Sequence, residues 1–195
     1  MTAETIKPLR IFIVAGEPSG DVLAARLMKG LNTLSKDRPI EFSGVGGPLM
    51  AEQGLKSLFT MDELSIMGIA EVLPQIPALL KRIKQTAQAA TTVKPDAFIT
   101  VDAPDFSFRV AKQLSDQPFP KIHYVAPSVW AWRAGRAAKV ARVIDQVLCL
   151  FPFEPPLMQA AGMRADFAGH PVVAEPQAND EDVGIFREKY GLETS

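Results

Sequence analysis

Short apolar runs rich in β-branched residues recur along the chain and alternate with longer stretches whose apolar residues lie three or four positions apart. The short runs are residues 9–15, 40–45, 97–101, 122–125 and 147–150. Continuous apolar runs of this length are typical of strands buried on both faces, and the wider spacing is typical of amphipathic helices. The alternation predicts an α/β fold with a parallel sheet and helices on both of its faces.

Length and composition agree with a soluble globular domain, because 195 residues with 47% hydrophobic and 22% charged side chains can form a substantial core. The single cysteine, Cys149, lies in an apolar run, which predicts a buried, unreactive thiol and excludes a disulfide within the chain. The first ten residues lack the apolar core of a signal peptide, and residues 11–15 are too few to span a membrane. We therefore expect a cytoplasmic protein.

Charge is distributed unevenly along the chain, although the formal net charge is only −1. Residues 76–150 carry 11 basic and 5 acidic side chains, whereas residues 151–195 carry 3 basic and 8 acidic ones. A basic middle segment suits nucleic acid, phosphorylated small molecules or anionic lipid. Few aromatic residues are interleaved with these bases, which disfavours single-stranded nucleic acid and favours phosphate or lipid.

The acid that follows the third apolar run, Asp102, is the first catalytic candidate. Ligands of open parallel sheets bind beyond the carboxyl ends of the strands, and the run 97–101 delivers Asp102 to such an end. Pro104 predicts an extended conformation for Ala103 and an end to the strand. Asp105 precedes a helix-like run from 106 to 114, so it is expected to cap that helix.

The first strand runs into residues 16–21, a glycine-containing turn followed by a helical pattern. Glu17 and Asp21 place two negative charges around this turn and would repel a pyrophosphate, so the turn is expected to hydrogen-bond substrate hydroxyls through Glu17, Ser19 and Asp21. In the alternative interpretation Ser19 caps the helix and Asp21 complements its dipole, which leaves Glu17 unexplained. Both interpretations stay open.

Two further segments carry candidate substrate contacts. Gly46 and Gly47 end the second strand and permit a tight turn or a close approach of a ligand to the backbone. Both tryptophans lie in residues 127–133, directly after the fourth apolar run, where they stack on a substrate or pack into the core. The site interpretation assigns substrate contacts in this segment to Ser128, Trp130, Trp132 and Arg133.

Residues 72–84 combine apolar positions at helical spacing with a cluster of cations, as an interfacial membrane helix does. Core packing gives the same spacing, but Pro74 and Pro77 would break a regular core helix and favour a surface element. The side chains expected to dock on the membrane are Val72, Leu73, Ile76, Leu79, Leu80, Lys81, Arg82 and Lys84. His123 and His170 have no partners at metal-ligand spacing, so no metal is assigned.

Considered together, several short motifs resemble the lipid-A-disaccharide synthase family over nearly the whole chain. They lie at residues 16–21, 46–50, 67–72, 102–106, 123–125, 127–133, 152–154 and 169–171. The resemblance implies the N-terminal half of a GT-B fold, in which two Rossmann-like domains face each other across a cleft. It also implies an inverting transfer of 2,3-diacylglucosamine from its UDP donor to 2,3-diacylglucosamine 1-phosphate (lipid X), with no metal or other cofactor. The essential aspartate of the family falls on Asp102.

The resemblance also implies an organisation in which residues 1–171 are the acceptor-side domain. Residues 172–195 are then a linker and the start of a donor-binding domain that lies outside this chain and is needed for any homodimer. The family works at the cytoplasmic face of the inner membrane as a peripheral protein. We expect this chain alone to be inactive, and the alternative is a non-catalytic module that binds acyl-glucosamine phosphate or membrane. A Rossmann-type nucleotide-binding enzyme is disfavoured by the acidic first turn.

Overall fold

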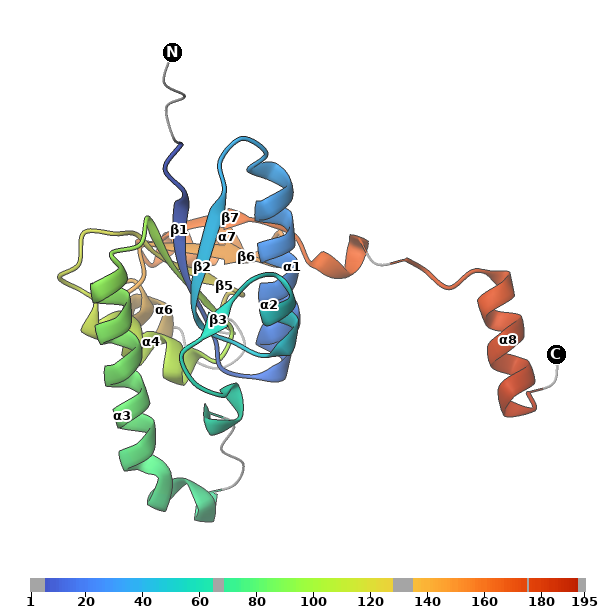
Figure 1. The fold of residues 1–195 in the computed structure, drawn as a ribbon, viewed down its shortest axis with the longest axis horizontal. Helices are drawn as coiled ribbons and strands as arrows, with labels where there is room; N and C mark the ends of the chain where they lie inside the picture. The colour runs from blue at the N-terminus through green and yellow to red at the C-terminus, as the bar shows by residue number, and fades with distance from the viewer. Residues whose placement is uncertain (1–5, 65–68, 128–134, 175, 193–195) are drawn as a thin grey trace.

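The computed structural model describes residues 6–64, 69–127, 135–174 and 176–192. These residues form a seven-stranded, all-parallel sheet in the order β3-β2-β1-β4-β5-β6-β7, which confirms the predicted α/β fold (Figure 1). The strands are β1 (Leu9–Ala15), β2 (Ile40–Val45), β3 (Lys56–Ser57), β4 (Ala97–Val101), β5 (Lys121–Tyr124), β6 (Gln146–Cys149) and β7 (Arg164–Phe167).

Helices cover both faces of this sheet. The α-helices are α1 (Pro18–Leu34), α2 (Pro48–Glu52), α3 (Ile69–Val93), α4 (Pro104–Gln113), α6 (Gly135–Val140), α7 (Glu154–Ala160) and α8 (Asp180–Tyr190), and short 3₁₀ turns form η1 (Met61–Leu64) and η2 (Pro171–Ala174). One apolar core lies between the sheet and α3, α4, α6 and α7, and a second lies between the sheet and α1 and α2. Figure 1 shows α1 and α2 on the side of the sheet opposite to α3 and α4.

The part of β1 from Ile11 to Ala15 is apolar without interruption because it is buried on both faces of the sheet. Phe12 and Val14 enter the first core, whereas Ile11, Ile13 and Ala15 enter the second, because successive side chains of a strand point to opposite faces. The rings of Phe12 and Phe98 stack with their centroids 5.8 Å apart and join β1 to β4. A strand buried on both faces has no polar positions to alternate with apolar ones.

The predicted strands at 9–15, 40–45 and 97–101 agree with β1, β2 and β4 residue for residue. The strands predicted at 122–125 and 147–150 each begin and end one residue earlier in the structure. The two edge strands, β3 and β7, were not predicted because their residues are mostly exposed and β3 has only two residues. Cys149 is buried as expected, and burial, together with the charges of Glu154 and Asp166, raises the pKa of its thiol to about 11.

Helix α3 differs from its prediction, because neither Pro74 nor Pro77 ends it and one helix runs from Ile69 to Val93. Figure 1 shows the first turns of α3 at an angle to the rest of the helix and extending beyond the sheet. A proline removes one backbone hydrogen bond and usually bends a helix that neighbouring turns still support.

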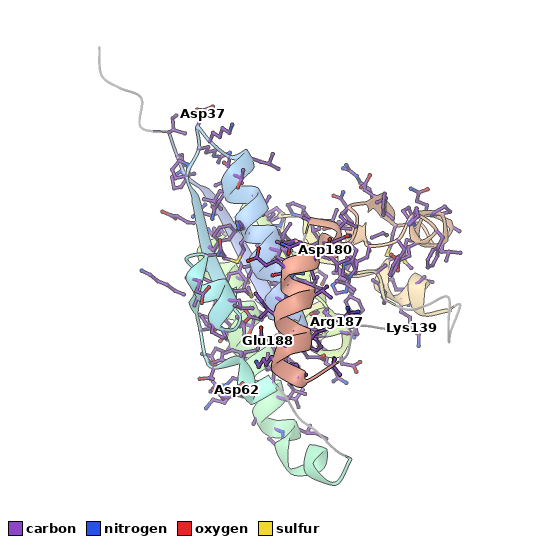
Figure 2. All side chains as sticks on the ribbon, turned by 90° about the vertical axis from the view of Figure 1, so that its right-hand side faces the viewer. Asp37, Asp62, Lys139, Asp180, Arg187 and Glu188 are labelled. Carbon is purple, nitrogen blue, oxygen red and sulfur yellow. The ribbon has the colours of Figure 1, made fainter. Side chains whose placement is uncertain are left out.

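The last helix, α8, begins at Asp180 and stands apart from the sheet in Figure 1. It is capped at both ends, because the side chains of Asn179 and Asp182 exchange hydrogen bonds with each other's backbone and Gly191 adopts a left-handed conformation. Figure 2 shows Asp180 at one end of α8 and Arg187 and Glu188 towards the other. The helix dipole favours an acid such as Asp180 in the first turn and a base such as Arg187 in the last. α8 lies within residues 172–195, which the sequence predicts to be a linker and the start of a further domain, and no residue of α8 is buried.

Asp21 joins α1 to the turn before α2. It is 3% exposed, and its Oδ1 accepts hydrogen bonds from the backbone amides of Gly47 and Met50, each at 3.0 Å. Its Oδ2 accepts a third bond from the amide of Leu49 at 3.1 Å. These amides have no partner within α2, because the first turn of a helix leaves its donors free. Asp21 thus caps α2 from a distant part of the sequence.

His123 is a buried histidine on β5. It is 1% exposed, its Nδ1 lies 2.7 Å from Oγ1 of Thr100, and its ring centroid lies 4.7 Å from that of Phe108. Burial lowers the pKa of His123 to about 3, because the surrounding core cannot solvate an imidazolium. The histidine is neutral at neutral pH and belongs to the core.

We expect Asp21→Ala to lower the free energy of unfolding by roughly 3 kcal/mol, because three backbone amides lose their acceptor and one of them is buried. Urea unfolding monitored by circular dichroism measures this loss. The matched control is Asp105→Ala, an exposed acid in the first turn of α4, which should cost less than about 1 kcal/mol. Equal losses for the two variants would contradict the assigned role of Asp21.

We expect His123 to make the protein less stable as the pH falls. The unfolded chain takes up a proton near the ordinary histidine pKa of 6.5, whereas the pKa of His123 in the folded chain is only about 3, so the stability is fully present above about pH 6.5 and is lost progressively below it. At pH 5 the loss is about 2 kcal/mol. Urea unfolding of His123→Gln at pH 7.5 and pH 5 tests this, because glutamine does not titrate. An unchanged pH dependence in the variant would contradict the assignment.

Candidate active site

The strand order places the carboxyl ends of β1 and β4 next to each other. Chain order reverses between these two strands, with β2 and β3 on one side and β5, β6 and β7 on the other. Ala15 is in register with Val101, so the turn after β1 and the turn after β4 lie side by side. A reversal of this kind opens a crevice in which parallel α/β sheets bind ligands.

Asp102 lies at this edge, directly after β4, and is half-buried. Its backbone amide donates to the carbonyl of Tyr124 at 3.1 Å, and the hydroxyl of Ser107 donates to the carbonyl of Asp102 at 2.9 Å. Asp102 and Ala103 both have positive φ, at 52° and 43°. The extended conformation predicted for Ala103 is therefore wrong.

The reason for this strained turn is the position of the following helix. α4 begins at Pro104, immediately after Ala103, so the chain must turn from strand to helix within two residues. Left-handed conformations of residues other than glycine cost of order 1–3 kcal/mol each and cluster at functional sites. The start of α4 at Pro104 also corrects the prediction for Asp105, which lies inside the first turn of the helix and is not its cap.

Ser19 brings α1 to Asp102. Its hydroxyl donates to Oδ2 of Asp102 at 3.0 Å. α1 begins at Pro18 with Glu17 in the capping position, so the interpretation of Ser19 as the helix cap is wrong. The Glu17 side chain is exposed and caps nothing in α1, so its carboxylate faces solvent beside the site.

Two glycines allow the turn after β1 to fit against the turn after β4. A Cβ atom at Gly16 would lie 3.0 Å from Cβ of Ala103, and one at Gly20 would lie 3.1 Å from the carbonyl oxygen of Val101. Both distances are shorter than ordinary contacts of a Cβ atom. The glycines thus bring the backbone of α1 close enough for Ser19 to reach Asp102.

The remaining predicted contacts have different outcomes. Asp21 does not serve as a hydroxyl partner, because it is buried and both of its oxygens bind backbone amides. Gly46 and Gly47 are close to protein atoms: a Cβ at Gly47 would lie 2.5 Å from Oδ2 of Asp21, and one at Gly46 would overlap Met50. The close approach predicted at these glycines is therefore to Asp21 and Met50. Ser128, Trp130, Trp132 and Arg133 lie outside the described residues.

The predicted membrane segment is exposed only in part. Ile76 is 38% exposed and Leu80 49%, whereas Leu79 packs against the core. Lys81 and Lys84 are also exposed, but Arg82 pairs with Glu63 of η1 and lies over the ring of Phe59 at 4.6 Å. Arg82 and Leu79 thus have contacts within the protein, and docking through them stays a prediction. The side chains of Val72 and Leu73 lie outside the described ones.

Two further observations concern the described part of the chain. None of its helices has the length and apolar character needed to cross a bilayer. Its histidine, cysteine and acidic side chains do not gather in groups of three that could hold a metal ion.

Sequence reasoning missed Ser107, which fixes the Asp102 carbonyl, because a serine within a helical pattern carries no signal of a tertiary hydrogen bond.

Comparison with known proteins assigns the chain to a family. Residues 11–194 match the lipid-A-disaccharide synthetase family. The chain is 56% identical to lipid-A-disaccharide synthase of Ruegeria pomeroyi, covering 94% of this chain and 46% of the relative. It is 53% identical to the enzyme of the same name from Rhodospirillum centenum, covering 96% of this chain and 47% of the relative.

A solved structure supports the fold independently of sequence. The chain is similar to UDP-GlcNAc 2-epimerase from Neisseria meningitidis, bound to UDP-GlcNAc, with a TM-score of 0.55 and 14% identity. The match covers 96% of this chain and 50% of the epimerase chain, and at this identity it bears on the fold alone. The chain spans about half the length of the curated relatives it matches. Because residues 11–194 match it, the chain belongs to the lipid-A-disaccharide synthetase family.

Proposed function

We propose that this chain is the acceptor-side part of a lipid-A-disaccharide synthase. The reaction transfers 2,3-diacylglucosamine from UDP-2,3-diacylglucosamine to lipid X and releases UDP. The observation that carries the proposal is the carboxylate of Asp102, held by Ser19 in a strained turn at the reversal of the sheet. Family membership supplies the substrate class.

In the proposed mechanism Asp102 acts as general base. The acceptor hydroxyl oxygen forms a bond to the anomeric carbon of the donor, and its proton passes to the Asp102 carboxylate. The bond between the anomeric carbon and the UDP oxygen breaks, and its electron pair leaves with UDP. Attack opposite the leaving group inverts the anomeric centre. A carboxylate positioned at the reacting hydroxyl contributes about 10²–10⁴-fold to such a transfer.

Other residues at the same edge are proposed to bind the sugar. The exposed Glu17 is suited to accept hydrogen bonds from substrate hydroxyls, because it lies in the turn beside Asp102 and caps nothing in α1. Ser128, Trp130, Trp132 and Arg133 remain proposed substrate contacts in the segment after β5. The donor is proposed to bind mainly to the half of the relatives that this chain does not match.

The domain organisation expected from the sequence remains part of the proposal. Residues 1–171 form the acceptor-side domain, and residues 172–195 link it to a donor-binding domain. The lack of buried residues in α8 agrees with this division, since a helix without a partner in this domain suits a neighbouring one. Any homodimer is proposed to need that second domain.

We also propose that the exposed side of α3 docks on the anionic inner membrane at its cytoplasmic face. Ile76 and Leu80 supply exposed apolar surface, and the exposed Lys81 and Lys84 lie beside them. The acyl chains of both substrates reside in the membrane, so docking would bring the protein to the surface that holds its substrates. The affinity of such a surface for a membrane is the sum of two contributions, the insertion of apolar side chains and the attraction of cations to anionic lipid.

We expect Asp102→Asn to lower kcat about 10²–10⁴-fold with little change in affinity for lipid X, because asparagine keeps the shape but accepts no proton. The assay uses a chimera of this chain with the second half of the Ruegeria pomeroyi synthase and measures UDP release in detergent micelles. The matched control, Asp105→Asn, lies three positions along the chain in the first turn of α4 and should keep near-normal turnover. Normal turnover of Asp102→Asn would remove this residue from the mechanism, whereas a chimera that releases no UDP without any substitution would leave a binding module as the better proposal.

We expect the double variant Ile76→Ser, Leu80→Ser to bind anionic vesicles several-fold more weakly without a change in melting temperature, because both side chains are exposed. Co-sedimentation with vesicles of phosphatidylcholine and phosphatidylglycerol measures the binding. Leu34→Ser is the matched control, since Leu34 is 83% exposed at the far end of α1. Equal loss of binding in the control, or none in the double variant, would contradict docking through α3.

A further inference from the structure

We propose that Ser19 is a positioning residue for Asp102, fixing the orientation of the carboxylate from the first turn of α1. The inference rests on the proposed function, because it concerns the same reaction. Its basis is the hydrogen bond from the Ser19 hydroxyl to Oδ2 of Asp102 at 3.0 Å. The two residues are 83 positions apart in the chain, so only the adjacent ends of β1 and β4 bring them together.

The backbone and the carboxylate of Asp102 are held by separate contacts. Tyr124 accepts from the Asp102 amide, and Ser107 donates to the Asp102 carbonyl, so these two bonds fix the main chain of the turn. Neither bond restrains rotation about the Cα–Cβ bond of Asp102. Among the described residues, Ser19 is the one whose side chain hydrogen-bonds the carboxylate.

Restraint of this rotation matters because Asp102 is only half-buried. A carboxylate at such a position has several rotamers of similar energy, and packing alone does not select one. The bond to Ser19 selects the rotamer in which Oδ2 faces α1. Oδ1 accepts no hydrogen bond from the described residues, and in the proposed mechanism it receives the proton of the acceptor hydroxyl.

The position of Ser19 makes it a rigid anchor. It lies in the first turn of a 17-residue helix, and the close fits of Gly16 to Ala103 and of Gly20 to Val101 hold that turn against the end of β4. A positioning group placed on a helix holds its partner more accurately than one placed on a loop. Loss of its hydroxyl therefore acts on the carboxylate and leaves the turn in place.

The test is a double-mutant cycle in the chimera with the Ruegeria pomeroyi half. We expect Ser19→Ala to lower kcat about 10-fold with KM for lipid X within about two-fold, and Ser19→Thr to restore most of the activity because it keeps the hydroxyl. In the Asp102→Asn background, Ser19→Ala should have no further effect on kcat. If Ser19 had a merely structural role, Ser19→Ala would instead lower kcat equally with and without Asp102→Asn and would shift the melting temperature.

Ser107→Ala is the matched comparison, because it removes a serine hydroxyl that bonds the backbone of the same residue. We expect it to lower the melting temperature, whereas Ser19→Ala leaves the melting temperature unchanged. A direct effect of Ser19 on substrate binding predicts a raised KM in place of a lowered kcat. That result, or additive losses in the cycle, would overturn the proposal.

A crystal structure of the Ser19→Ala chain tests the positioning itself without an assay. We expect the Asp102 carboxylate to leave its single orientation while the backbone at Asp102 and Ala103 stays unchanged. An unmoved carboxylate would overturn the inference even if Asp102→Asn is inactive. Normal turnover of Asp102→Asn with a displaced carboxylate in Ser19→Ala would instead refute the proposed role of Asp102 as general base.

Discussion

The parallel pairing of β1 with β4 is the constraint on which the candidate site depends. These two strands are distant in sequence, buried on both faces and joined in a register that ends with Ala15 beside Val101. Because both strands end at the same level, the residues that follow them must share one edge of the sheet. Chain order reverses at this pair, so the turns after the two strands lead to helices on opposite faces and leave the edge between them open.

Burial separates the roles of two aspartates that lie near this edge. Asp21 is buried beneath α2 and accepts hydrogen bonds from three free backbone amides at the start of that helix. These bonds fix the turn after β2. Asp102 stays half-buried, and within the part of the chain that the structure describes its carboxylate accepts a hydrogen bond from the hydroxyl of Ser19. A carboxylate with its oxygens committed to backbone amides stabilises structure, whereas one that keeps an accessible oxygen can accept a proton from a substrate.

Arg82 illustrates the same principle for a cation. In the sequence it belongs to a cluster with Lys81 and Lys84, and all three suit an anionic surface. In the structure Arg82 turns towards the protein, pairs with Glu63 and covers the ring of Phe59, which ties η1 to α3. The planar guanidinium can satisfy a carboxylate and an aromatic face together, whereas the exposed lysines retain water and remain available to lipid.

The sequence by itself determined the α/β class, the bounds of β1, β2 and β4 and the place of Asp102 directly after a buried strand, because continuous apolar runs and strand-end acids are local patterns. It did not determine β3 or β7, whose exposed edge residues show no apolar run, or the passage of α3 through Pro74 and Pro77. Tertiary structure alone decided that Asp21 is a cap and that Ser19 meets Asp102. Those contacts join residues 26 to 83 positions apart, and their partners are backbone amides and a hydroxyl, groups that no sequence pattern marks.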